Sequence, residues 1–358
     1  MGIRSELDPL HHVTAVRAVD GKNVEREATV AWPAHPDHPP YGLVVRRRTF
    51  DGMVAHHAAS AGAVLLEGHE AIEPILERGF VRGARVRSAA GVHDIRATYL
   101  VVADGANSRF GRAVGTFRRP DVPYAIGARS YWRTDRHAEQ TVEAVLGLED
   151  RNGNALPGYG WVFPLGDGTV NVGIGLLSTA RDIKSINPTH LLDAFVGDIA
   201  RRWGIDPGRQ LDKASTNRIP MGASIDPQAG PTFLVIGDAA ASANPLSGEG
   251  IGMAYETGRL AAEVLHDALD AGDSAELQRY PRLLRERHAE YQRTARVVAR
   301  VLGRPAGARQ LTGAVLRSRR LLEATLRIET ASLRPGGRGF AEATYRALAT
   351  IARLTPGA

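Results

Sequence analysis

The 358-residue sequence contains no cysteine, which excludes a disulfide framework, a cysteine nucleophile and thiolate metal sites within the chain. It also lacks any run of about eighteen uninterrupted apolar residues, so we expect no transmembrane helix. The first ten residues, MGIRSELDPL, contain neither the apolar core of a signal peptide nor a myristoylation pattern. These absences make the cytoplasm the expected compartment.

Acidic residues are the minority charge, with 39 Asp and Glu against 45 Lys and Arg, and nearly all of the basic residues are arginine. The resulting net charge of +6 has two interpretations. One interpretation is that the excess of arginine reflects genomic base composition. The other is that arginines near the C-terminus bind anionic lipid head groups. No zinc-finger spacing, RNP motif or basic heptad helix is present, so we expect neither a metal site nor a nucleic-acid partner.

The most informative stretch is residues 231–265, where a strand leads into a helix. Phe233–Ile236 is a short apolar run typical of a buried strand, and Gly237 and Asp238 end it. From about Gly250 onward, apolar and small residues recur at helical spacing. The turn in between therefore lies at the carboxyl end of a strand, where α/β proteins bind ligands.

The residue types of this turn suit a dinucleotide with a flat ring. Asp238 can accept hydrogen bonds from a sugar or polyol hydroxyl. Pro245, Gly248 and Gly250 let the backbone approach a ring closely, because glycine has no Cβ. The amides of Gly250 and Ile251 at the helix start would face the ring with partial positive charge, and so would stabilise a reduced flavin.

The ordered pattern GDAAA followed by NPLSGEGI resembles the second FAD motif of the hydroxybenzoate-hydroxylase-like flavoproteins. A generic strand-turn-helix in another α/β protein is the alternative. The resemblance implies FAD as cofactor, with Gly237 among its contacts. It also implies an α/β fold: an FAD/NAD(P)-binding three-layer fold, N-terminally incomplete, with an inserted antiparallel β-sheet substrate domain and a C-terminal helical tail.

Two further segments match the same superfamily. A strand at Leu43 leads into a helix that we expect to be N-capped by Asp51 and ended by Gly62. Within it, Arg47 matches an arginine near the cofactor pyrophosphate, and a solvated basic edge is the alternative. After the strand 99–102, Asp104-Gly105 resembles the DG motif, whose backbone helps to hold FAD, although Asp-Gly alone is usually a turn.

The centre of the chain is predicted to be mainly β, and the C-terminus helical. A hairpin is expected at 80–100. The region after Ala271, called the tail here, is predicted to form amphipathic helices rich in arginine. The expected strands are Tyr124–Arg133, Thr141–Leu148, Tyr159–Leu165 and Val170–Leu177, and the expected helices are His190–Trp203, Tyr280–Leu302, Gln310–Ile328 and Gly339–Leu354. Packing against the domain is one interpretation of the tail, and contact with a membrane surface is the other.

The stretch PGYGWVFP narrows the function. In a strand, Tyr159, Trp161 and Phe163 share one face and form an apolar wall suited to a hydrocarbon chain, whereas an ordinary core face is the alternative. With Pro164, the stretch resembles the P-G-Y-x-W-x-F-P element of the geranylgeranyl reductase family of FAD-dependent oxidoreductases. These four residues are therefore the expected substrate-binding residues.

The resemblance extends from about Arg47 to Ala271 and is strongest to the actinobacterial menaquinone reductases. It implies noncovalent FAD and a reduced electron donor, either NAD(P)H or a ferredoxin-like protein. The product would be a prenyl lipid of menaquinone or geranylgeranyl type with one isoprenoid double bond saturated. No catalytic acid or base can be assigned from the sequence.

The chain departs from this family in lacking an initial βαβ unit with G-x-G-x-x-G and a Cys-Gly-rich segment. A misassigned start codon or a true fragment with little flavin affinity would each account for this. Two other functions stay open: an FAD-dependent aromatic monooxygenase or epoxidase, and a flavin-free isoprenoid-binding or degenerate protein.

The expected organisation has five segments, and the expected location is the cytoplasm, either without membrane contact or peripheral on the inner face of the cell membrane. The segments are an N-terminal substrate-domain segment (1–45), an FAD-binding segment (46–115), the substrate-binding β-sheet domain (116–225), a second FAD-binding segment (226–275) and the C-terminal helical region (276–358).

Overall fold

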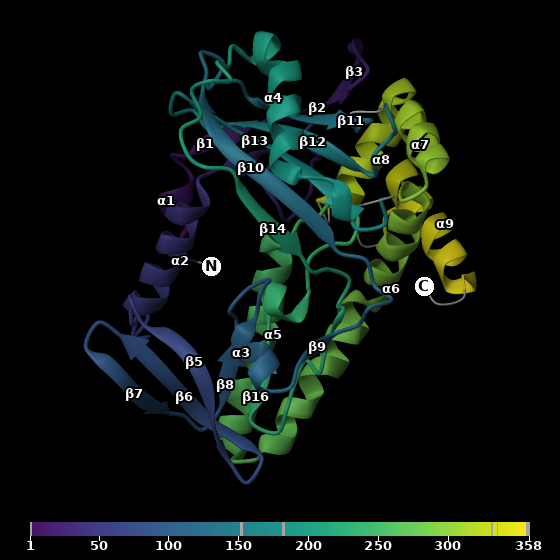
Figure 1. Cartoon of the computed structure of the whole chain (residues 1–358). Helices are drawn as coiled ribbons and strands as arrows, with labels where there is room; N and C mark the ends of the chain where they lie inside the picture. The colour runs from purple at the N-terminus through teal and green to yellow at the C-terminus, as the bar shows by residue number, and fades with distance from the viewer. Residues whose placement is uncertain (1, 151–152, 181–182, 331, 335, 356–358) are drawn as a thin grey trace. The chain divides into compact units, whose positions relative to one another are not determined.

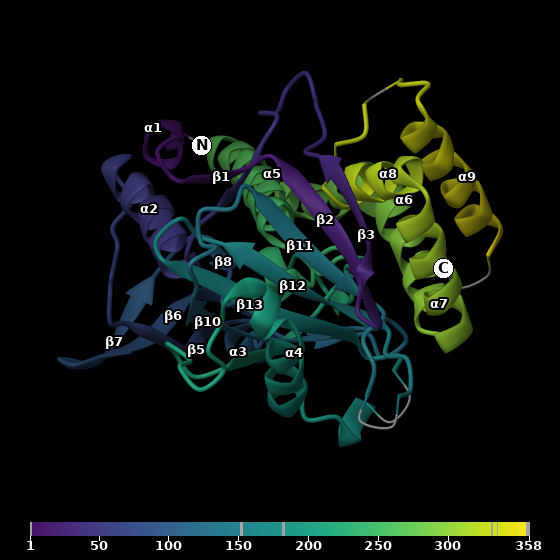
Figure 2. The same cartoon turned by 90° about the horizontal axis from the view of Figure 1, so that it is seen from above.

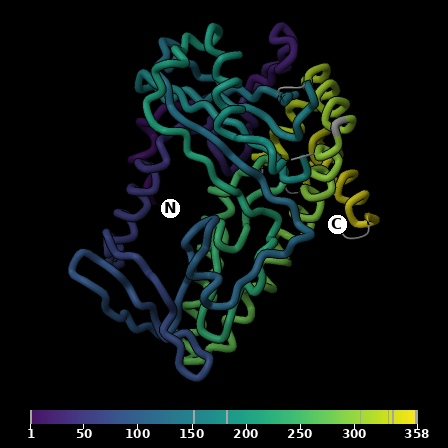
Figure 3. Tube along the Cα trace, in the orientation of Figure 1, coloured from purple at the N-terminus to yellow at the C-terminus, as the bar shows by residue number. Residues whose placement is uncertain are grey.

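A computed structural model describes residues 2–150, 153–180, 183–330, 332–334 and 336–355. The chain divides into two compact units, each assembled from separate stretches of sequence, as the trace in Figure 3 shows by colour. Unit 1 comprises Met1–Leu65, Ile126–Asn217 and Arg300–Leu348, whereas unit 2 comprises Leu66–Ala125, Arg218–Ala299 and Ala349–Ala358.

Unit 1 is organised around a sheet whose described strands follow the order β14-β10-β13-β12-β11-β2-β3 (Figures 1 and 2). β2 and β11 pair in parallel, whereas the pairs β2–β3, β11–β12 and β12–β13 are antiparallel. The bounds are β2 (Ala15–Asp20), β3 (Asn23–Ala31), β10 (Ala125–Arg133), β11 (Thr141–Leu146), β12 (Gly158–Pro164), β13 (Thr169–Leu177) and β14 (Ser215–Ile219), with a separate pair of β1 (His11–Val13) and β4 (Gly42–Val44).

Helices cover both faces of this sheet. On one face α4 (Pro188–Trp203) buries Leu192, Phe195 and Ile199 against residues of β11, β12 and β13. The helix starts where the Asn187 side chain accepts hydrogen bonds from two backbone amides, and it ends at Gly204 in the left-handed conformation. On the other face α7 (Pro305–Arg317) and α8 (Arg319–Glu329) pack over β2 and β3. Unit 1 also contains α1 (Arg4–Leu7), α2 (Arg47–Ser60) and most of α9 (Phe340–Leu354).

Unit 2 contains a parallel pair of strands and two long helices. β8 (Leu100–Val102) pairs in parallel with β16 (Phe233–Val235). α5 (Ile251–Ala271) and α6 (Arg279–Leu302) bury an apolar cluster that includes Leu234 of β16. The remaining elements are β5 (Glu70–Glu77), β6 (Phe80–Ser88) and β7 (Gly91–Arg96) in one antiparallel sheet, the short pair β9 (Phe117–Arg118) and β15 (Ile225–Asp226), and helix α3 (Arg109–Ala113).

The predicted α/β fold with a helical C-terminal region is confirmed, with four corrections. The sheet predicted to be antiparallel is mixed, because β2 and β11 pair in parallel. α2 begins at Arg47, so Asp51 lies inside the helix and is not its N-cap. The single helix expected over Gln310–Ile328 is two helices, because the Ser318 side chain caps α8 by accepting a hydrogen bond from Leu321 N. β5, which precedes the predicted hairpin, was not predicted.

None of the helices in the described part of the chain combines the length and the apolar composition needed to span a bilayer.

Candidate functional site

The two aspartates singled out in the sequence follow neighbouring parallel strands of unit 2. β16 and β8 pair with Val235 opposite Val102, and Ile236 N donates a hydrogen bond to Val102 O at 3.0 Å. Asp238 follows Val235 by three residues, and Asp104 follows Val102 by two residues. Because parallel strands end at the same edge, the structure brings together two motifs that lie more than a hundred residues apart in sequence.

Gly237 makes the sharp turn that leaves β16. Its φ of +57° lies in the left-handed region, which glycine enters without strain. Its buried amide donates to Thr257 Oγ1 of α5 at 3.0 Å, and an added Cβ would touch Ala254 at 3.4 Å. The turn therefore lies directly against α5. The half-buried Asp238 that follows is also close to the start of this helix, since a Cβ added at Gly250 would lie 3.0 Å from Asp238 Oδ1.

The loop from the turn to α5 is held in shape by Asn244, a residue that the sequence analysis missed. Asn244 is buried, its Nδ2 donates to Tyr291 Oη at 2.5 Å, and its Oδ1 accepts from Leu246 N at 2.9 Å. Its backbone also bonds to Glu249 O and Gly248 N. An Asn before a proline is a turn signal, so the Asn244-Pro245 pair could have marked this position.

The start of α5 can receive an anionic, planar group. Glu249 Oε1 accepts from Gly252 N at 2.7 Å, whereas the amides of Gly250 and Ile251 have no hydrogen-bond acceptor among the described residues. Ile251 is exposed, and Gly248 adopts a φ of +73°. Unpaired amides at a helix start favour negative charge, so these residues fit the edge of a flavin.

The Asp104 carboxylate makes its hydrogen bonds to residues of its own loop. Oδ1 accepts from Ser108 Oγ at 2.5 Å, and Oδ2 accepts from Phe110 N at 2.9 Å. Ser108 Oγ in turn accepts from Gly111 N and so caps α3. The carboxylate thus fixes the loop around Gly105, whose φ is +76°. The expected backbone contact with the cofactor stays a prediction.

Arg46 and Arg47, the first two of three consecutive arginines, differ in what they contact in unit 1. Arg46 donates to Asp167 Oδ2 at 3.2 Å and to Thr169 Oγ1 at 2.9 Å, which ties it to the hairpin between β12 and β13. Arg47 begins α2, is exposed, and pairs with Asp51 at 3.1 Å one helical turn along. Its expected contact with a pyrophosphate stays a prediction.

The aromatic residues of β12 form one face, as predicted. The ring centroids of Tyr159 and Trp161 lie 6.0 Å apart, and those of Trp161 and Phe163 lie 6.1 Å apart. All three side chains are half-buried, and Trp161 Nε1 donates to Asn171 Oδ1 at 2.8 Å. Pro164, by strand alternation, faces the other side and is buried. The structure thus brings together three of the four predicted substrate-binding residues.

A glycine on the neighbouring strand makes room for this aromatic face. Gly173 pairs with Trp161 across β12 and β13, and a Cβ at Gly173 would overlap the indole. Gly175 leaves more space, with its added Cβ 3.6 Å from the same ring. The Trp161 indole therefore lies over Gly173, and only glycine fits at position 173 beneath the ring.

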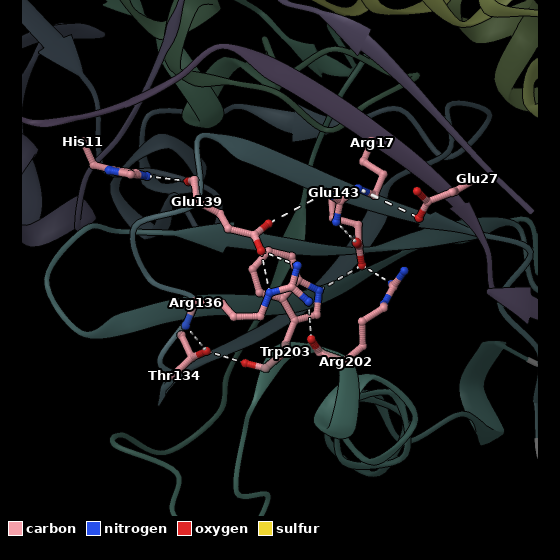
Figure 4. Close-up of polar contacts among 9 residues, drawn as sticks. All are labelled: His11, Arg17, Glu27, Thr134, Arg136, Glu139, Glu143, Arg202 and Trp203. Carbon is pink, nitrogen blue, oxygen red and sulfur yellow. Dashed lines mark hydrogen bonds and ion pairs between the residues drawn. The ribbon is translucent and has the colours of Figure 1, made fainter. Parts of the chain in front are cut away.

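The opposite face of the sheet carries a buried ionic network that the sequence analysis missed (Figure 4). At its centre is Glu143 of β11, whose side chain is 0% exposed. Arg202 and Trp203 of α4 donate to its Oε1, and Arg17 of β2 lies 3.4 Å from its Oε2. Burial raises the pKa of Glu143, against the opposing effect of Arg202, Trp203 and Arg17. A charged residue inside an apolar strand could have signalled this network.

Comparison with known proteins identifies the family. The FAD binding domain family matches residues 4–297. Menaquinone reductase of Mycobacterium tuberculosis is 33% identical over 328 residues, which cover 92% of this chain and 78% of that protein. Digeranylgeranylglycerophospholipid reductase of Methanosarcina mazei is 32% identical over 234 residues, which cover 65% of this chain and 55% of that protein.

A solved structure agrees with this relationship. The crystal structure of a geranylgeranyl bacteriochlorophyll reductase-like protein from Thermoplasma acidophilum superposes with a TM-score of 0.71 at 25% identity, covering 88% of this chain and 79% of that chain. The fold, the two strand-end motifs and these matches agree. The chain belongs to the FAD binding domain family and is an FAD-dependent oxidoreductase of the geranylgeranyl reductase type.

Proposed function

We propose that this flavoprotein saturates an isoprenoid double bond of a prenyl lipid of the menaquinone or geranylgeranyl type. The observation that supports this most is the aromatic face of Tyr159, Trp161 and Phe163, since three adjacent half-buried rings suit a hydrocarbon chain. The names of the relatives, menaquinone reductase and digeranylgeranylglycerophospholipid reductase, point to the same substrate class.

In this proposal, unit 2 supplies most of the FAD contacts. Asp238 accepts hydrogen bonds from hydroxyls, the backbone of Gly237 and Gly248 allows close approach, and the amides of Gly250 and Ile251 stabilise negative charge on the ring. Pro245 and the backbone of Asp104 and Gly105 complete these contacts. Bound FAD would supply hydride transfer, which no side chain of this chain can perform.

Saturation of an alkene requires a hydride on one carbon and a proton on the other. A reduced donor, NAD(P)H or a ferredoxin-like protein, would restore the reduced cofactor after each turnover. In this proposal the aromatic face of Tyr159, Trp161 and Phe163 binds and orients the lipid chain and excludes water. Because the substrate is a membrane lipid, we place the protein peripherally on the inner face of the cell membrane.

The test is to reconstitute the full chain with FAD and add a chemical reductant and menaquinone or a geranylgeranyl lipid. We expect a product that has gained two hydrogens, detected by mass spectrometry. Trp161→Ala should raise the KM for the lipid about tenfold, because a large aromatic contact is lost. Phe117→Ala, on an exposed residue of unit 2, is the control and should behave as wild type.

Three outcomes would contradict the proposal. Protein that takes up FAD but reduces no prenyl lipid would exclude this substrate class. Oxygen consumption coupled to hydroxylation of an aromatic compound would instead favour the monooxygenase alternative. Protein that stays colourless after incubation with FAD would favour the flavin-free alternative.

A further inference from the structure

A pocket of about 310 Å³ opens between α8 and the start of α9 in unit 1. Figures 1 and 2 show these two helices, both in yellow tones, side by side. Arg320, Glu323, Ala324 and Arg327 recur at helical spacing and present one stripe of α8 to the pocket. The opposite wall is formed by Arg334 and by residues 337–342, which lead into α9 and form its first turn.

The pocket wall carries more positive than negative charge. Four arginines line it, at positions 320, 327, 334 and 338, against two glutamates, at 323 and 342. This leaves an excess of two positive charges in a confined space. Like charges held close together repel one another unless an anion lies between them.

Both glutamates are already engaged with the protein. Glu323 Oε1 accepts from Arg327 Nε at 3.1 Å. Glu342, which is buried, accepts from Arg334 N at 3.2 Å. Burial opposes its ionisation, but backbone hydrogen bonds and the charges of Arg327 and Arg334 outweigh this and lower the pKa of Glu342. The two carboxylates therefore compensate the charges of Arg327 and Arg334.

Two of the four guanidinium groups are also fixed. Arg327 has a side chain only 11% exposed, and its Nη1 donates to Ala34 O at 3.1 Å. Arg334 donates to the same carbonyl at 3.3 Å. By contrast, the side chains of Arg320 and Arg338 are exposed and make no hydrogen bond or ion pair with any described residue. The uncompensated charge therefore belongs to these two arginines on opposite walls.

We propose that this pocket binds a phosphate group between Arg320 and Arg338. Phosphate carries up to two negative charges and several acceptor oxygens, and the planar fork of arginine matches it. Phe340 also lines the pocket and is 50% exposed. An exposed aromatic beside a cationic pocket is typical of contact with the headgroup region of a bilayer, so an anionic lipid is the favoured source and free phosphate the other.

The test compares the full-length wild type with the double variant Arg320→Ala/Arg338→Ala. The control is Arg133→Ala/Arg201→Ala, which removes the same charge from exposed unit 1 residues that have no hydrogen bond or ion pair with any described residue. Binding is measured by co-sedimentation with phosphatidylcholine vesicles, with and without phosphatidylglycerol, and by the shift in unfolding temperature with inorganic phosphate. None of these measurements needs FAD or turnover, so they are independent of the proposed function.

We expect wild type and control to prefer phosphatidylglycerol vesicles, and the pocket variant to lose at least about tenfold more of this binding than the control. Stabilisation by inorganic phosphate that only the pocket variant loses, without a vesicle preference, would support the pocket with free phosphate as its source. Equal losses in the pocket variant and the control would overturn the proposal, since they would reflect general charge. Absence of binding to either probe by wild type would also overturn it.

Discussion

Arg17 and Glu143 occupy the same register position on the parallel strands β2 and β11, with Arg17 Nη1 3.4 Å from Glu143 Oε2. The carboxylate also receives hydrogen bonds from Arg202 and Trp203 of α4, so one buried group links two strands and a helix. The register places Glu143 opposite Val162, whereas Trp161 faces the other side. The network thus supports the sheet from behind the aromatic face.

Replacing this carboxylate should destabilise unit 1. Glu143→Gln keeps the shape but removes the counter-charge of Arg202 and the nearest carboxylate of Arg17, and breaking a buried ion pair costs about 3–5 kcal/mol. Urea unfolding followed by circular dichroism measures the loss. Glu25→Gln, on an exposed residue of β3 outside the network, is the control and should cost about 0.5 kcal/mol or less. Equal losses of unfolding free energy in both variants would show that the network around Glu143 does not stabilise unit 1.

The sequence predicted the local elements of unit 1 but not this network. Alternating apolar residues placed β12 and β13 to within two residues, because strand pattern is local. Which strands become neighbours is not local: β2 pairs with β11, more than a hundred residues away, and only this pairing brings Arg17 to Glu143. The start of α2 was also mispredicted at Asp51: the residue before the helix is Arg46, whose side chain contacts the distant Asp167 and Thr169.

In the candidate cofactor site, too, local patterns predicted some residues, whereas residues that depend on long-range contacts were missed. Motif patterns identified Gly237, Asp238 and Asp104, and strand pairing then placed the two turns at one edge. Asn244 was missed because its role depends on Tyr291 of α6, a contact that no local pattern encodes. The assignment of individual residues to FAD and substrate stays a prediction for the experiments described here.

Glu329 should make stability depend on pH. It ends α8 on the same side as Leu322 and Leu326, which face the sheet, and desolvation raises its pKa from an ordinary value of 4.5 to about 7. The fold therefore keeps a proton that the unfolded chain releases, so stability falls as pH rises from about 4.5 to about 7. The penalty above that range is up to about 3 kcal/mol, since each pKa unit is worth about 1.4 kcal/mol.

Glu329→Gln should remove this dependence. We expect the variant to match wild type at pH 4 and to be more stable at pH 8 by up to about 3 kcal/mol. Urea unfolding at a series of pH values checks it, with Glu25→Gln, an exposed residue of β3, as the control. Parallel pH profiles for wild type and Glu329→Gln would mean that Glu329 is solvated in the fold.

Gly173→Ala should disrupt the aromatic face, because the added methyl group would overlap the Trp161 indole. Overpacking of this kind costs about 1–3 kcal/mol, and the displaced indole should shift the tryptophan emission. Gly175→Ala is a matched control, since its methyl group would make an ordinary contact at 3.6 Å with the same ring. Binding of a prenyl lipid, followed by quenching of that emission, should weaken in Gly173→Ala and persist in Gly175→Ala. If both variants bind the lipid as wild type does, the aromatic face is not the binding surface.

Asn244→Ala should weaken FAD binding more than it weakens the fold. The change leaves Tyr291 Oη without its donor and Leu246 N without its acceptor, which costs about 1–3 kcal/mol, and it frees the loop that carries Gly248 and Gly250. Because the loop must be ordered again on binding, we expect the Kd for FAD to rise about tenfold or more. Flavin fluorescence titration measures the affinity, and thermal unfolding of the FAD-free protein measures the fold. Tyr291→Phe, which removes only one of the two contacts, should show an intermediate Kd. A loop that merely packs without touching the cofactor would instead lower the unfolding temperature in both variants and leave the Kd unchanged.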